Sequence, residues 1–139
     1  MAHWLFKSEP SAWSFEKLAR LGAAGTDWSG VRNHSAKLNM QAMKVGEQGF
    51  FYHPHEGKAI VGIVEVCKAY RPDPTDASGK FGMVDIRALR PFPKPVALEA
   101  IKLEKRLSAM ALVTNSRLSV QPVTDAEWAF LRKAGGVDS

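Results

Sequence analysis

Aromatic side chains interleaved with small polar ones are the residues of this chain best suited to chemistry on a ligand. They lie near the ends of predicted strands and comprise Trp13, Trp28, Phe51, Tyr52 and Tyr70, together with Ser8, Ser29, Asn33 and Asn39. A flat nucleobase needs an aromatic wall, and each stacked base is stabilised by about 1–3 kcal/mol. Its Watson–Crick edge needs fixed donors and acceptors, which serine, asparagine and backbone groups supply. The pattern therefore indicates a nucleobase pocket, although aromatic residues beside strands are equally typical of a hydrophobic core.

Trp28 stands apart from the other aromatic residues because its neighbours in the chain are polar. Asp27 precedes it, and Ser29 and Gly30 follow it. We therefore expect Trp28 to face a cavity rather than the core. Three other aromatic residues are assigned to the core: Phe50, Phe81 and Trp128.

Motifs for catalysis or metal binding are scarce. The chain has no glycine-rich phosphate loop, no nucleophile elbow and no zincin helix. His53 and His55 are two residues apart, but a third and a fourth ligand for a metal are missing. The sequence therefore predicts neither a metal nor a cofactor.

The balance of charge favours a polyanionic partner. Lysine and arginine number 19 against 14 aspartates and glutamates, which gives a formal charge of +5 and a pI near 9.5. Such a charge attracts nucleic acid at long range and releases counterions on binding. The 139 residues suit one domain spanning 1–139. No secretory signal and no apolar stretch of about 20 residues is visible, so we expect an intracellular, cytoplasmic protein without a membrane partner, or a nuclear one in a eukaryote.

Periodicity and capping signals predict the elements that position these residues. Strands are predicted at 3–7, 48–53, 59–70, 81–91 and 118–123, and helices at 14–21, from 33 or 35 to 43, and at 98–110, with a last helix behind a capping box at 124–127. Gly62 inside a strand suggests a bend or a close backbone approach. Pro91, Pro93 and Pro95 suggest a stiff connector. Unequal helices and loops between the strands favour a mixed α+β domain around a small, mostly antiparallel barrel.

Eight blocks of sequence, in order along nearly the whole chain, resemble the EVE-domain family. They are WLFKSEP at 4–10, WSGVRN at 28–33, NMQAMKVG at 39–46, FFYH at 50–53, IVGIVEV at 60–66, YRPDPT at 70–75, VDIR at 84–87 and SRLSVQPV at 116–123. The resemblance implies a PUA-like pseudo-barrel of about five to six mostly antiparallel strands flanked by helices, related to YTH and ASCH domains. It also implies a non-catalytic reader that holds a modified base, such as a modified cytosine, of DNA or RNA in an aromatic pocket.

The resemblance also implies which residues form the base pocket. Trp28 would form one wall, and Ser29 would hydrogen-bond the base edge. Lys7 and Ser8 would line the floor from the end of the first strand. Arg32 is a further candidate for a phosphate contact.

The same resemblance assigns the rim and the flanking contacts. Asn33, Tyr52 and His53 would complete the rim of the pocket. Arg117 and Ser119 would contact the flanking backbone, which positions the strand without reading its sequence.

The chain departs from the family pattern in two places. The family usually has aspartate after the tryptophan, where this chain has Ser29, and a serine donates as well as accepts hydrogen bonds. The family also commonly has a longer, tyrosine-rich loop after the position of Thr75, where this chain has only residues 76–80. We therefore expect a different base preference or a capping role for Ser29, and a more open pocket.

Two other functions stay open from the sequence. A small amidohydrolase acting on acylated nucleosides, as in some ASCH domains, would arrange Lys7, Ser8 and Glu65 together, since a hydroxyl nucleophile needs an adjacent base or amine. An ordinary ion pair between Lys7 and Glu65 is the simpler interpretation of these residues. A recruitment module for a nuclease or another partner would use the basic helix with Lys102, Lys105 and Arg106. The sequence sets no oligomeric state.

Overall fold

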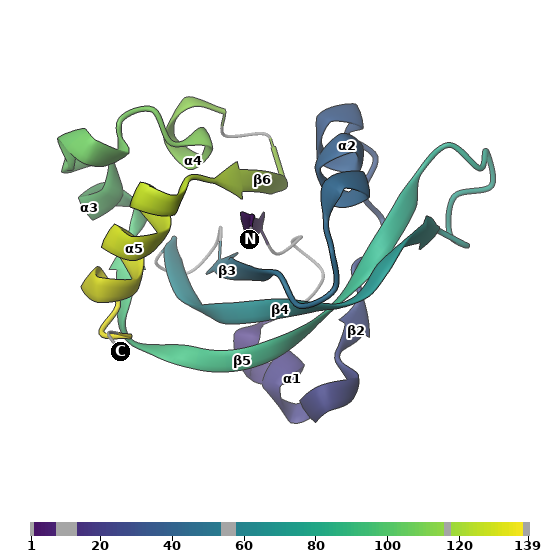
Figure 1. The fold of residues 1–139 in the computed structure, drawn as a ribbon, viewed down its shortest axis with the longest axis horizontal. Helices are drawn as coiled ribbons and strands as arrows, with labels where there is room; N and C mark the ends of the chain where they lie inside the picture. Colours follow the sequence, from purple (N-terminus) through teal and green to yellow (C-terminus); the bar gives the residue numbers. More distant parts are fainter. Residues whose placement is uncertain (1, 8–13, 54–57, 116–117, 138–139) are drawn as a thin grey trace.

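A curved six-stranded sheet with helices on both faces organises the protein, as a computed structural model of residues 2–7, 14–53, 58–115 and 118–137 shows (Figure 1). The strands are β1 (His3–Lys7), β2 (Thr26–Asp27), β3 (Gln48–His53), β4 (Ala59–Pro72), β5 (Gly82–Ala97) and β6 (Val120–Val123). The helices are α1 (Phe15–Arg20), α2 (His34–Ala42), α3 (Leu98–Leu103), α4 (Ala111–Thr114) and α5 (Asp125–Ala134), with 3-10 helices η1 (Gly22–Ala24) and η2 (Lys105–Leu107).

The strand order is β2-β5-β4-β3-β1-β6. β1 pairs with β3 in parallel, and the other four pairings are antiparallel. The predicted α+β class with mostly antiparallel strands is therefore confirmed. The sheet curves but, among the described residues, it does not close, because β2 and β6 lie at opposite ends of the order.

Alternation along the strands divides the core between the two faces of the sheet. Phe6 of β1 and Phe51 of β3 face α1 and α2, in a cluster that includes Leu18 and Met40. Leu5, Phe50 and Tyr52 lie in a second cluster with residues of α3, α4 and α5, including Ile101, Leu112 and Trp128. Each face of the sheet therefore has its own apolar filling.

Close packing explains the glycine that interrupts β4. A Cβ on Gly62 would lie 2.4 Å from Cε1 of Phe15, so the ring of α1 rests directly on the strand there. The register with β5 shifts between Ile60 and Gly62. The sequence predicts a bend or a close backbone approach at Gly62, and the structure shows a register shift and the close approach of a side-chain ring.

Strand β5 is longer than the sequence predicts. Pro91, Pro93 and Pro95 belong to the strand rather than to a connector. β2 pairs with β5 only at Asp85 and Ile86, so the prolines lie along a stretch with no second neighbouring strand among the described residues. Proline is tolerated there because that edge needs no N–H donors.

The predicted helix over 98–110 is wrong in its extent. α3 ends at Leu103, and the Glu104 carboxylate accepts from the Arg106 backbone N–H at 3.3 Å to cap η2. α4 then begins after Met110. A side chain that offers the backbone an alternative hydrogen bond ends a helix that periodicity alone would continue.

Candidate nucleic-acid interface

Three of the predicted site residues meet where β1 and β3 end. Lys7 and Tyr52 are register partners on the parallel strands. The Lys7 backbone N–H donates to the carbonyl oxygen of Ser119 at 2.8 Å. The Lys7 ammonium nitrogen lies 5.8 Å from the centre of the Tyr52 ring. The structure therefore places Lys7, Tyr52 and Ser119 together at one end of the sheet.

Burial changes the electrostatics of this group. It lowers the pKa of Lys7, because the charged ammonium loses water. It raises the pKa of Tyr52, whose side chain belongs to the second core cluster. A partly desolvated cation over an aromatic ring attracts an anion more strongly than a fully hydrated lysine would.

His53 belongs to the opposite face of the sheet. Its Nε2 accepts a hydrogen bond from the Phe15 backbone N–H at 3.1 Å, so the ring provides an extra cap for α1. Its ring meets Phe51 edge-on, with centroids 5.4 Å apart. Accepting at Nε2 requires that nitrogen to be unprotonated, which leaves the proton on Nδ1.

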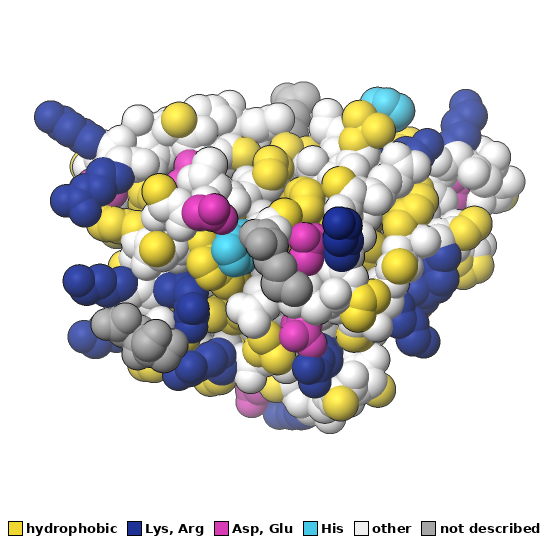
Figure 2. Space-filling model, in the orientation of Figure 1, with side chains coloured by type: hydrophobic (Ala, Val, Ile, Leu, Met, Phe, Trp, Pro, Cys, Tyr) yellow, Lys and Arg dark blue, Asp and Glu magenta, His cyan; other side chains and the backbone are white. Residues whose placement is uncertain are grey.

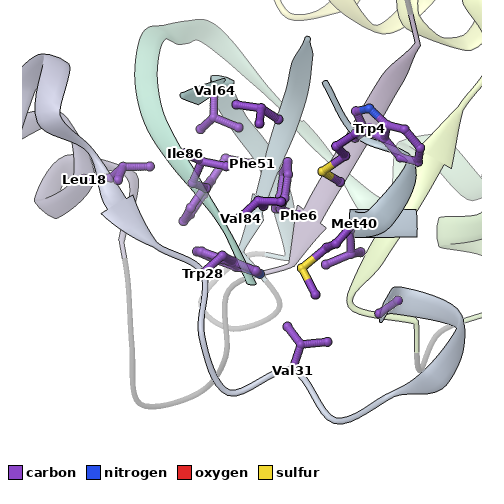
Figure 3. Close-up of a cluster of buried hydrophobic side chains, with 14 of the residues drawn as sticks. Trp4, Phe6, Leu18, Trp28, Val31, Met40, Phe51, Val64, Val84 and Ile86 are labelled. Carbon is purple, nitrogen blue, oxygen red and sulfur yellow. The ribbon is translucent and has the colours of Figure 1, made fainter. Parts of the chain in front are cut away.

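Trp28 lies in the core rather than facing a cavity. It is 4% exposed, and its ring meets Phe6 and Phe51 at centroid distances of 5.7 and 5.9 Å (Figure 3). Its backbone N–H donates to the Val84 carbonyl at 2.7 Å. The expected exposure of Trp28 is therefore wrong: its polar neighbours in the chain turn outward while the indole fills the space between β1, β3 and α2.

Asp73 holds the segment after Trp28 in place, and the sequence did not predict this role. Its carboxylate, which is fully buried, accepts from the Gly30 backbone N–H at 2.8 Å and from the Arg32 guanidinium at 3.2 Å. It also accepts from the Thr75 N–H at 2.7 Å and the Thr75 hydroxyl at 2.6 Å. The signal in the sequence is Asp-Pro-Thr, because aspartate commonly bonds the backbone two residues on.

These contacts keep the pKa of the Asp73 carboxyl below its ordinary value. Burial by itself raises the pKa, but the hydrogen bonds from Thr75, Gly30 and Arg32 together outweigh it. The carboxylate is therefore charged at neutral pH. The segment that carries the candidate base-binding residues is fixed to the β4–β5 hairpin by an ionic anchor.

Among the other residues of this segment, Arg32 and Asn33 already have hydrogen-bond partners. Arg32 pairs with Asp73 and also donates to the Thr75 hydroxyl at 3.0 Å, so its charge is largely neutralised and it is a poor phosphate ligand. Asn33 caps α2, with its Oδ1 accepting from the Ala36 N–H at 3.0 Å. Within the described residues the half-buried Ser29 side chain makes no hydrogen bond.

The sheet separates the predicted site residues into two groups. Tyr52 follows Phe51 in β3, so the two rings lie on opposite faces. One group contains Lys7, Tyr52 and Ser119, and the other contains Trp28, Ser29, Asn33 and His53. The remaining two predicted residues, Ser8 and Arg117, lie outside the described residues.

The arrangement needed for an amidohydrolase is absent. Glu65 is the register partner of Gln48, whereas Lys7 is the partner of Tyr52, four residues further along β3. At about 3.3 Å per residue, roughly 13 Å of strand separates the two positions. Glu65 instead accepts from the Arg87 guanidinium on β5, with Nε at 2.8 Å. Lys7 and Glu65 therefore do not form the expected ion pair and are not brought together as the catalytic grouping requires, while Ser8 lies outside the described residues.

In the described ranges, no three histidine, cysteine, aspartate or glutamate residues are grouped so that they could hold a metal ion. No helix in those ranges is long and apolar enough to cross a membrane.

Comparison with known proteins gives the same family along nearly the whole chain. The family described as EVE domain matches residues 2–134. Chicken thymocyte nuclear protein 1 is 35% identical over 93% of this chain and 66% of its own length. This chain therefore spans about two thirds of that relative. The human protein of the same name is 32% identical over 94% of this chain and 72% of its own length.

Solved structures extend the likeness to three dimensions. A protein from Rhodopseudomonas palustris is 57% identical with a TM-score of 0.93, covering 100% of this chain and 96% of its own. Human THYN1 in complex with 5-methylcytosine-containing DNA is 30% identical with a TM-score of 0.89, covering 100% of both chains. A YTH domain from Zygosaccharomyces rouxii, 16% identical with a TM-score of 0.58 over 99% of this chain and 86% of its own, shares the fold. None of these names is that of an enzyme, in agreement with the non-catalytic interpretation.

Proposed function

The chain belongs to the EVE domain family, and we propose that it is a non-catalytic reader that binds nucleic acid through one modified base. One observation carries the proposal: the likeness to human THYN1 bound to 5-methylcytosine-containing DNA extends over both whole chains. This chain therefore shares its fold with a relative in complex with DNA. A methylated cytosine in DNA is the first ligand to test.

The geometry around Trp28 supports it as one wall of the pocket. Phe6 and Phe51 meet its ring at interplanar angles of 76° and 77°. Neither phenylalanine is stacked parallel on the indole, and a parallel arrangement is the one a base would take. Because Trp28 is 4% exposed, a base can reach its ring only after the neighbouring chain moves outward.

Ser29 is the proposed reader of the base edge. Its hydroxyl can both donate and accept, and the Asp73 anchor on Gly30 fixes the backbone beside it. Such preorganisation lowers the entropy lost when a ligand binds. Asn33 and His53 keep their proposed places on the rim.

Lys7, Tyr52 and Ser119 lie on the other face of the sheet from Trp28, and we propose that they contact the backbone of the same nucleic acid. The desolvated Lys7 ammonium suits a phosphate or a base carbonyl at the end of the sheet. Ser8 follows Lys7 directly in the chain, and Arg117 precedes Ser119 by two residues, so both are proposed to contact the same ligand.

A binding screen tests the proposal. The protein would be titrated with matched single- and double-stranded DNA and RNA oligonucleotides at two salt concentrations. The oligonucleotides would carry no modification, 5-methylcytosine, 5-hydroxymethylcytosine or N6-methyladenine. We expect a preference for one modified base that persists at the higher salt, because base contacts do not depend on counterion release. Weak, salt-sensitive binding to every oligonucleotide, or no binding, would contradict it.

The Ser29→Ala variant tests whether the Ser29 hydroxyl contributes to recognition of the modified base. Loss of one hydrogen bond of about 1 kcal/mol should reduce the preference for the modified base roughly fivefold. Ser35→Ala, at an exposed position on α2, is the matched control and should leave the preference unchanged. An equal effect of both substitutions would remove Ser29 from the site.

A further inference from the structure

The cationic side chains fall into two classes. One class forms ion pairs: Arg20 with Glu16, Arg32 with Asp73, Lys68 and Arg71 with Asp85, Arg87 with Glu65, and Arg106 with Glu104. The other class makes no ion pair with a described residue, and six of its members lie just before β4 or on β5, α3 and α5: Lys58, Arg90, Lys94, Lys102, Arg132 and Lys133. We call these six the basic surface.

Backbone contacts bring the basic surface together from three parts of the chain. The Lys94 N–H donates to the Gly135 carbonyl at 3.0 Å, which joins β5 to the end of α5 where Arg132 and Lys133 lie. The Leu98 N–H donates to the Lys58 carbonyl at 2.7 Å, which joins the start of β4 to α3. Lysine and arginine side chains gather over these elements, on the side of the molecule where α3 and α5 lie (Figure 2).

The side chain of Arg132 points to an anionic ligand for this surface. Its Nε is buried and has no hydrogen-bond partner among the described residues. A buried donor without a partner is costly, by about 1–3 kcal/mol. The rest of the guanidinium group pairs with no described carboxylate, so its charge is left for an anion at this edge of α5. Glu127, the carboxylate at the start of the same helix, is already used in the capping box with Thr124.

The extent of the basic surface fits a polymer of phosphates rather than a single anion. Arg90 lies seven positions along β5 from Ala97, the register partner of the residue that follows Lys58, which is about 23 Å of strand. One strand of duplex DNA carries a phosphate about every 3.4 Å along the axis, so several phosphates would face this length. Apolar side chains for membrane insertion are few: Leu103, 80% exposed, is the large apolar residue exposed on α3.

We propose that the basic surface binds the sugar–phosphate backbone of the nucleic acid whose modified base occupies the site at the ends of β1 and β3. This inference rests on the proposed function. Lys58 lies beside Ala59, the register partner of His53, so the basic surface begins next to the candidate site and extends away from it along β5. The site selects the base, and the basic surface supplies affinity without selectivity.

The test compares two double variants with equal loss of charge. Lys94→Gln/Lys133→Gln removes two cations of the basic surface. Lys17→Gln/Lys44→Gln removes two exposed cations elsewhere, on α1 and before β3. Binding of both variants and of the unaltered protein is measured against a 5-methylcytosine duplex and the same unmodified duplex over a series of salt concentrations. Thermal unfolding confirms that both variants fold.

In the basic-surface variant, the binding constants for both duplexes should fall by about an order of magnitude at low salt. The ratio of the two binding constants should stay the same. The slope of log K against log salt should become shallower by about 1.8, at about 0.9 for each phosphate that the variant no longer neutralises. The control variant should keep the slope of the unaltered protein. Equal slopes for the two variants overturn the proposal.

Three other outcomes are distinguishable. A normal base preference with an unchanged slope in the basic-surface variant overturns the basic surface but keeps the reader. A shallower slope without any base preference keeps the surface and overturns the reader. Polyglutamate and anionic lipid vesicles are also tested as competitors at equal charge. If either competes as effectively as the unmodified duplex, the surface binds another partner and the proposal is overturned.

Discussion

The indole of Trp28 has two roles if the proposed pocket is correct. It fills space in the apolar cluster beside Phe6 and Phe51, and it offers a ring face to a base. A side chain packed against two other rings has little freedom to rotate. That rigidity favours binding, because the aromatic wall is ordered before the ligand arrives.

Replacing Trp28 by alanine should therefore destabilise the fold as well as abolish binding. A buried aromatic residue cut to alanine costs about 3–5 kcal/mol. Trp28→Phe should cost only about 1–2 kcal/mol while narrowing the stacking surface. Urea denaturation gives the two costs, and oligonucleotide titration of the folded Trp28→Phe protein gives the loss of base preference. A stable Trp28→Ala protein would mean that the indole is not part of the core.

The packing of α1 on the sheet depends on the absence of a side chain at Gly62. Gly62→Ala would push a Cβ into the Phe15 ring, and overpacking of this kind costs about 1–3 kcal/mol. Phe15→Leu in the same chain should restore part of that stability, since it removes the opposing ring. A double-mutant cycle by chemical denaturation measures the coupling. Strictly additive effects would show that the two residues are not in contact.

At the scale of elements, carboxylates hold two turns, one beside the candidate site and one at the opposite end of β3. Asp73 anchors the segment after Trp28, and Glu47 accepts from the Trp4 indole N–H at 3.0 Å and from the Lys44 N–H at 2.8 Å. Each carboxylate joins segments more than 40 residues apart in the chain. The loops are therefore positioned by long-range ionic contacts as well as by packing.

Asp73→Asn should loosen the segment that carries Ser29. The asparagine amide group has to face a donor, either the Gly30 N–H or the Thr75 N–H, and the lost charged hydrogen bond costs about 1.5–3 kcal/mol. Hydrogen exchange at Gly30 should accelerate. Asp76→Asn is the control, because Asp76 accepts from Ser78 and Phe81 in the same hairpin and not from Gly30. Equal protection of Gly30 in both variants would contradict the anchor.

Local signals in the sequence were sufficient for the regular elements and insufficient for the site. β1 and β3 have the predicted bounds, and the capping box at Thr124 and Glu127 is confirmed. These features depend on a few adjacent residues. The burial of Trp28 depends on Phe6 and Phe51, which are far away in the chain, and its polar neighbours gave the opposite indication. Long-range contacts such as that between Asp73 and Gly30 have no local signature.

At the scale of the whole molecule, several titrating groups act in the same direction on stability. Burial lowers the pKa of His3 and outweighs the nearby carboxylate of Asp125, 3.3 Å away. For Glu47, burial raises the pKa, but the hydrogen bonds from Lys44, Trp4 and Ala2 together lower it by more, so the net shift is downward. The hydrogen bonds on Asp73 lower its pKa in the same way. In each case the unfolded chain binds the proton more readily than the folded protein does.

Stability should therefore fall in two steps as the pH decreases. The contribution of His3 is fully present above its unfolded pKa of 6.5, and it is lost as the pH falls from there through the lower folded value. The contributions of Glu47 and Asp73 are present above their unfolded values of 4.5 and 3.8, and they are lost as the pH falls through their folded values. Urea denaturation at a series of pH values would show both steps.

Two variants assign the steps. His3→Phe preserves an aromatic ring beside Trp128, on which His3 is stacked at 4.2 Å, and it should remove the step that begins near the unfolded pKa of 6.5 while leaving the acid step. His34→Gln, at an exposed position, should keep both. Glu47→Gln should reduce the acid step alone, because a neutral amide has no charge to lose. If the first step survives in His3→Phe, another group is responsible for it, and the stacked imidazole does not couple protonation to folding.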